Sequence, residues 1–205
     1  MTTLERPNSA LLVIDVQNQV VEGAFNKDAV IVGINTAVHK ARSAGVAVVW
    51  IQHSDDWMVI GSDDWKIVPE LNPLDSEFKV GKLYRNSFEA TDLEVMLAGL
   101  NVGHVYLCGA QTNNCVRHTA HGALDRGYDV TLIEDAHTTT DYKFEGQNVS
   151  AEVLVDDLNA SFTEYELPGR KANVVTVDEV FEWFPVEKMD VITAEKLIEY
   201  KKENV

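Results

Sequence analysis

Two kinds of hydrophobic pattern alternate along the chain. Residues 10–14 (ALLVI) and 46–51 (VAVVWI) are short, uninterrupted apolar runs, which are typical of strands buried on both faces of a sheet. Between them, apolar residues recur at helical spacing from residue 28 to residue 44, and Gly45 ends this stripe. The order predicts a strand, a crossover helix and a second, parallel strand.

The rest of the chain repeats this alternation. Apolar runs predict strands at residues 105–108, 130–133 and 174–177. Helical spacing predicts helices over residues 93–100, 116–127 and 154–165, and near 178–183 and 193–202. We therefore predict an α/β fold of three layers (α/β/α) with a doubly wound, mostly parallel, Rossmann-like sheet, formed by one domain of residues 1–205. Ligand sites in such folds lie beyond the carboxyl ends of the strands.

Residues 52–85 interrupt the pattern. The segment has no strong periodicity, contains Pro69 and Pro73, and is rich in tryptophan and aspartate. A connection of this length in a compact domain usually carries function or short helices of its own. We therefore expect it to form a wall of the ligand pocket that includes Trp57 and Trp65, with simple packing as the alternative role of these two side chains.

The charge and cysteine content narrow the range of partners. There are 33 acidic against 17 basic residues, a net charge of -16, which repels nucleic acids and anionic membrane surfaces. No segment approaches the roughly 18 apolar residues of a membrane span, and no targeting segment is evident. Two cysteines without a CxxC pair are too few for a disulfide scaffold and wrong for structural zinc, so we expect reduced thiols and a cytoplasmic protein.

Two polar residues lie near the carboxyl ends of predicted strands. Asp15 comes after the first strand, at the sheet edge where α/β folds place their chemistry, although a turn or helix cap is an alternative role. Cys115 falls in the first turn of a helix, where backbone N–H groups and the helix dipole are expected to lower the pKa of a thiol. Cys108, inside an apolar strand, is expected to be an inert core residue, and a purely structural Cys115 stays possible on position alone.

Three separated segments resemble the isochorismatase-like cysteine hydrolases, a superfamily that contains nicotinamidases and isochorismatases. They read LLVIDVQN with Asp15, GKLYRNSFEATDLEVML with Lys82, and CGAQTNNCVRHTAHGALDRGYDVTLIEDA with Cys115. The resemblance implies that Cys115 attacks an amide carbonyl while Asp15 takes the thiol proton and Lys82 keeps Asp15 ionised. It also implies an oxyanion hole from the backbone N–H groups of Cys115 and of Gln111, the residue after an expected cis peptide bond.

The segment after the second strand departs from the nicotinamidase pattern. Nicotinamidases carry an Asp-x-His motif followed by further histidines that bind a metal, whereas this chain reads IQHSDD at residues 51–56 and has no histidine between His53 and His104. We therefore predict no metal and no cofactor, and nicotinamide loses favour as a substrate. His53 is expected to line the pocket instead, with a plain strand-end histidine as the alternative.

Other residues near the triad are candidate substrate contacts. Gln17 and Asn18 follow Asp15, with a plain turn as the alternative, and Phe88 lies close to Lys82 in sequence. We expect a small-molecule substrate whose C–N bond is cleaved through a thioester. The alternatives are a vinyl-ether hydrolase of isochorismatase type and a catalytically idle, oligomeric binding protein. The family commonly forms dimers or tetramers, so we expect a homo-oligomer, to which residues 184–205 could contribute.

Overall fold

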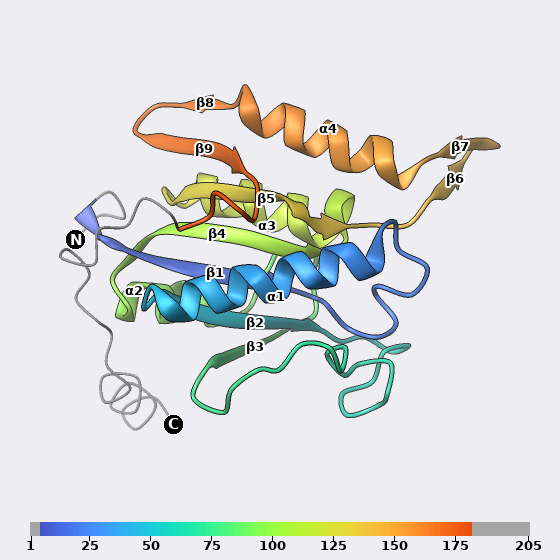
Figure 1. The fold of residues 1–205 in the computed structure, drawn as a ribbon, viewed down its shortest axis with the longest axis horizontal. Coiled ribbons are helices and arrows are strands. Elements are labelled where there is room, and N and C mark those ends of the chain that lie inside the picture. The colour runs from blue at the N-terminus through green and yellow to red at the C-terminus, as the bar shows by residue number, and fades with distance from the viewer. Residues whose placement is uncertain (1–4, 182–205) are drawn as a thin grey trace.

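A seven-stranded sheet runs through the middle of the molecule (Figure 1). The computed structural model describes residues 5–181. Along the sheet the strands are ordered β3-β2-β1-β4-β5-β9-β8, and all neighbours pair in parallel except the edge pair β8 and β9. The strands are β1 (Asn8–Ile14), β2 (Ala47–His53), β3 (Phe78–Lys82), β4 (Val102–Ala110), β5 (Asp129–Thr138), β8 (Glu166–Leu167) and β9 (Arg170–Val175). The predicted, mostly parallel sheet is confirmed.

Helices cover both faces of this sheet. Because successive residues of a strand point to opposite faces, Leu11 packs in one core with α1 (Lys27–Ser43), while Leu12 packs in the other. The second core includes α2 (Leu93–Gly99), α3 (Arg117–Asp125) and α4 (Ala151–Thr163). Burial on both faces explains why β1 and β2 read as unbroken apolar runs. Among the described residues, no helix combines the length and hydropathy of a membrane span.

Strand β3 was missed in the sequence, because residues 52–85 were read as one irregular excursion. β3 lies at the edge of the sheet and buries only alternate residues, Phe78, Val80 and Lys82. Lysine at one of these buried positions and glycine at an exposed one hide the alternation that normally marks such a strand. The loop of residues 54–77 therefore connects two neighbouring parallel strands, β2 and β3.

The remaining differences lie outside the central sheet. A hairpin of β6 (Tyr142–Phe144) and β7 (Gln147–Val149) and the short strand β8 were not predicted, and β5 extends past its apolar run to Thr138. A five-residue π-helical turn, η2 (Thr112–Val116), precedes α3. Residues 177–181 form turns instead of the predicted helix start. The rest of that helix, the helix predicted at 193–202, the possible contact segment 184–205 and the ends of the single-domain prediction lie outside the described residues.

Candidate active site

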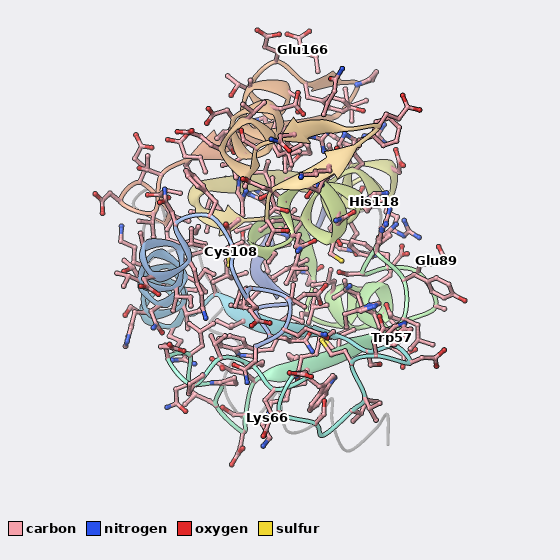
Figure 2. The ribbon with its side chains drawn as sticks, turned by 90° about the vertical axis from the view of Figure 1, so that its right-hand side faces the viewer. Trp57, Lys66, Glu89, Cys108, His118 and Glu166 are labelled. Carbon is pink, nitrogen blue, oxygen red and sulfur yellow. The ribbon has the colours of Figure 1, made fainter. Side chains whose placement is uncertain are left out.

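Three polar side chains meet at the carboxyl edge of the sheet, onto which Figure 2 looks. Asp15 follows β1, Lys82 ends β3, and Cys115 lies in η2 just after β4. The ends of neighbouring parallel strands share one edge, which brings these distant segments together. Lys82 Nζ lies 2.6 Å from Asp15 Oδ2 and donates a hydrogen bond to Cys115 Sγ at 3.3 Å. It also donates to the Tyr84 carbonyl at 3.2 Å, so the ammonium joins the carboxylate and the sulfur.

The Asp15–Lys82 pair is buried almost completely, with side-chain exposures of 1% and 0%. Burial raises the pKa of Asp15, and the Lys82 ammonium and the Cys115 thiol act against that rise. Asp15 itself has a φ of 48°, a left-handed conformation that aspartate adopts more readily than most residues. The result is a carboxyl group of increased basicity, paired with an ammonium, beside the sulfur.

The pKa of Cys115 differs from the prediction. Burial of the side chain and the negative charge of Asp15 raise the pKa of the thiol to about 12, although Lys82 opposes the shift. The lowering of the thiol pKa that was expected at the start of a helix is outweighed, because the sulfur is mostly buried and faces a carboxylate. Cys115 is therefore a neutral thiol in the resting protein, next to a base that can accept its proton.

The turn that carries Cys115 is held close to Asp15 by the backbone. The Ala110–Gln111 peptide bond is cis, and the Asn114 and Val116 N–H groups donate to the Gln111 carbonyl. Gly109 has a φ of 118°, and a Cβ atom there would lie 2.1 Å from the Ile14 carbonyl oxygen. Only glycine lets β4 pass so near the residue that precedes Asp15.

A hydrogen-bond chain behind this turn was not anticipated from the sequence. Thr112 Oγ1 and His137 Nδ1 are 2.9 Å apart, and His137 Nε2 lies 2.9 Å from Asn159 Oδ1. Asn159 Nδ2 donates to the Glu134 carbonyl, so its Oδ1 is the acceptor and His137 carries its proton on Nε2. Burial lowers the pKa of His137 to about 4, which keeps the ring neutral and able to accept the Thr112 hydroxyl proton. The polar cluster at residues 137–140, a few residues beyond the apolar run 130–133, was the available signal.

A cavity of about 290 Å³ opens beside Cys115. Its wall comes from four segments that are distant in sequence: Asp15, Gln19, Val20, His53, Asp55, Met58, Arg85, Gln111, Asn114 and Cys115. Of the residues predicted to contact substrate, His53 lies on this wall. Its Nε2 is 3.4 Å from Asp55 Oδ2, and no third His, Cys, Asp or Glu within residues 5–181 joins them in a metal-binding group.

The other predicted substrate contacts lie elsewhere in the described structure. The fully buried amide of Gln17 bonds the His53 backbone and the Trp65 carbonyl, so its predicted role is corrected to a brace between β2 and the 54–77 loop. Phe88 is 5% exposed and packs in the core against Tyr128, which likewise corrects its predicted role.

Three further predicted contacts belong to loops and are absent from the cavity wall. Asn18 donates to the Asp63 carbonyl, and the carbonyl of the half-buried Trp65 accepts from Gln17 and Gln52. Trp57, labelled in Figure 2, is 85% exposed. None of the three aromatic residues predicted to contact substrate, Trp57, Trp65 and Phe88, lines the cavity, whose wall is built mainly from polar residues.

A buried carboxylate, ammonium and thiol at the end of a parallel sheet define a hydrolase-type site on an α/β fold. Residues 9–163 match the family model described as the isochorismatase domain. This match covers more than half of the sequence, and the chain belongs to the isochorismatase family of hydrolases.

Individual relatives differ in what their names say they act on. The chain is 33% identical over 142 residues to streptothricin hydrolase from Streptomyces noursei, covering 66% of this chain and 56% of that protein. It is 27% identical over 176 residues to ureidoacrylate amidohydrolase from Cronobacter sakazakii, covering 65% and 76%. The chain thus spans little more than half of the first relative and about three quarters of the second.

Solved structures share the fold. A cysteine hydrolase from Pseudomonas syringae has a TM-score of 0.76 at 22% identity, with 97% of this chain and 95% of that chain covered. N-carbamoylsarcosine amidase from Thermoplasma acidophilum has a TM-score of 0.67 at 24% identity, with 85% and 99% covered. At these identities the likeness establishes the α/β architecture alone.

Proposed function

We propose that the chain is a cysteine hydrolase that cleaves a carbon–nitrogen bond, of amide or carbamoyl type, in a small molecule. The observation that carries this proposal is the position of Lys82 Nζ, 2.6 Å from Asp15 Oδ2 and 3.3 Å from Cys115 Sγ, at the edge of a cavity. The names of ureidoacrylate amidohydrolase and N-carbamoylsarcosine amidase add support, because both describe hydrolysis of such bonds.

The first half of the reaction forms the thioester. Cys115 Sγ attacks the carbonyl carbon while its proton moves to Asp15, because a thiol with a pKa near 12 is a poor nucleophile until it loses that proton. The backbone N–H groups of Gln111 and Cys115 are the proposed donors to the oxyanion. When the tetrahedral intermediate collapses, Asp15 returns the proton to the departing nitrogen, and ammonia or an amine leaves.

The second half restores the enzyme. Asp15 takes a proton from water, the resulting hydroxide attacks the thioester carbonyl, and the carbon–sulfur bond breaks. The sulfur regains its proton and the acid product leaves. In both halves of the reaction the Lys82 ammonium stabilises the negative charge of Asp15, because burial alone would favour the protonated carboxyl.

The test is ammonia release from a panel of small primary amides and ureido compounds. We expect turnover by the wild type and by Cys108→Ala, and none above background by Cys115→Ala. Equal rates from wild type and Cys115→Ala would refute the thioester mechanism. Retained cleavage of a vinyl ether by Cys115→Ala would instead favour the isochorismatase-type alternative, which does not need the sulfur.

We further propose a cytoplasmic homo-oligomer, a dimer or tetramer. Both described cysteines are free thiols, which agrees with a reducing compartment. Large apolar side chains stay exposed near the cavity and on the β6–β7 hairpin, among them Trp57, Ile60 and Phe144. Light scattering coupled to size exclusion tests the assembly, and a monomeric mass at micromolar concentration would contradict it.

A further inference from the structure

The charged side chains on the cavity wall differ in whether they have a hydrogen-bond or ion-pair partner. Asp15 is paired with Lys82. Asp55 Oδ1 accepts the N–H groups of Trp57 at 2.8 Å and Met58 at 2.7 Å, and its Oδ2 lies 3.4 Å from His53. These N–H groups lower the pKa of Asp55 and hold its carboxylate in a structural role. Each acidic side chain on the wall therefore already has a partner.

Arg85 is the exception among the charged side chains of the wall. It lines the cavity, is exposed to solvent, and makes no hydrogen bond or ion pair with any residue between 5 and 181. The backbone on both sides of it is anchored, because Lys82 Nζ donates to the Tyr84 carbonyl and the Ser87 N–H donates to Thr119 Oγ1. The guanidinium is thus unpaired among the described residues, while its backbone is held in place on the cavity wall that it shares with Cys115.

We propose that Arg85 binds a carboxylate of the substrate, which makes the substrate class small amido or ureido acids; this inference rests on the proposed C–N hydrolase function. A net charge of -16 repels an organic acid at long range, so an acid needs a local cation to bind. A guanidinium offers paired N–H donors that match a carboxylate. The other cation of the site, the Lys82 ammonium, is already joined to Asp15 and Cys115.

Two alkylating reagents of equal size test this without knowledge of the substrate. Iodoacetate carries a carboxylate and iodoacetamide a neutral amide, and both alkylate a cysteine sulfur. We expect the ratio of the iodoacetate to the iodoacetamide rate constant at Cys115, each relative to N-acetylcysteine, to fall about threefold to tenfold in Arg85→Gln. Peptide mass spectrometry separates modification of Cys115 from that of Cys108.

Lys79→Gln is the matched control. Lys79 is exposed on β3, outside the cavity wall, and its substitution changes the net charge by the same amount. We expect Lys79→Gln to keep the wild-type ratio. An unchanged ratio in Arg85→Gln overturns the inference. An equal fall in Lys79→Gln also overturns it, because the charge would then act through the electrostatic field of the whole protein and not at the cavity.

Ammonia release separates this inference from the proposed function. We compare 3-ureidopropionate with N-propylurea, which has a methyl group in place of the carboxylate. We expect Arg85→Gln to raise KM for 3-ureidopropionate about 10- to 100-fold, with a smaller change in kcat, and to leave N-propylurea unaffected. Cys115-dependent turnover that prefers N-propylurea, or that ignores Arg85→Gln, overturns the carboxylate assignment and leaves the C–N hydrolase proposal standing. Ammonia release unaffected by Cys115→Ala would instead refute the proposed hydrolase function, and the alkylation ratio would remain the test of Arg85.

Discussion

Cys108 and Cys115 are seven positions apart and sit in contrasting surroundings. Burial raises the pKa of both thiols, so burial does not distinguish them. Cys108 lies inside β4, where the only polar contact described for its sulfur is the Leu12 carbonyl at 3.8 Å, whereas Cys115 has an ammonium at 3.3 Å and a carboxylate within reach of its proton. The comparison teaches that the proposed nucleophile, Cys115, differs from the core thiol in having a nearby acceptor for its proton, and not in having a lowered pKa in the resting state.

Gly109 separates the two regions, and its substitution has the largest expected effect. In Gly109→Ala the new Cβ atom would overlap the Ile14 carbonyl, at a φ that side chains rarely adopt. We expect the free energy of unfolding to fall by about 5 kcal/mol or more, beyond the range of ordinary point mutants. Urea denaturation measures it, with Gly81→Ala as the control, since a Cβ there meets no atom within 4 Å. Equal stabilities of the two variants would contradict the expected clash.

Lys82→Met removes the group that makes the surroundings of Cys115 unlike those of Cys108. Breaking a buried ion pair leaves the Asp15 carboxyl without its counter-charge, so the free energy of unfolding should fall by about 3–5 kcal/mol. The pKa of Asp15 then rises further, the carboxyl is protonated over more of the pH range, and ammonia release should drop at least about 100-fold. The double variant Asp15→Asn/Lys82→Met should recover part of the stability and none of the activity. Recovery of activity would show that the pair is only structural.

The central strands of the fold were predictable because their positions depend on apolar spacing alone. The runs at residues 10–14 and 46–51 are buried on both faces, and their positions required no knowledge of tertiary contacts. β3 was not predictable in this way, because one of its inward positions is the catalytic candidate Lys82. The resemblance located Asp15, Lys82 and Cys115, whereas the cavity wall depends on how the 54–77 loop folds over the edge. Gln17 and Phe88 were misassigned because proximity in sequence does not fix the direction of a side chain.

Alkylation kinetics sharpen the comparison between the two thiols. Because the pKa of Cys115 in the folded protein is raised to about 12 from an ordinary 9.0, the thiolate fraction at pH 8 is reduced and labelling by iodoacetamide should be at least about tenfold slower than in the urea-unfolded chain. The rate should keep rising above pH 9, while Cys108, at 0% exposure, stays unlabelled until the protein unfolds. A rate at Cys115 that levels off below pH 8.5 would show an activated resting thiolate.

The smallest expected effect comes from the hydrogen-bond chain that holds the Cys115 turn. Thr112→Val leaves His137 Nδ1 buried without its donor, so the free energy of unfolding should fall by about 1–3 kcal/mol. Displacement of the turn should lower kcat about tenfold with a smaller change in KM, because the turn carries Cys115 whereas most of the cavity wall comes from other segments. Since the pKa of His137 is lowered to about 4, the wild type should itself lose stability as the pH falls from 6.5 toward 4, where the unfolded chain binds the proton more readily. Thr36→Val, which removes a hydroxyl from α1 that donates to the Val32 carbonyl, is the matched control; if it lowers kcat equally, the chain through His137 does not position the proposed nucleophile.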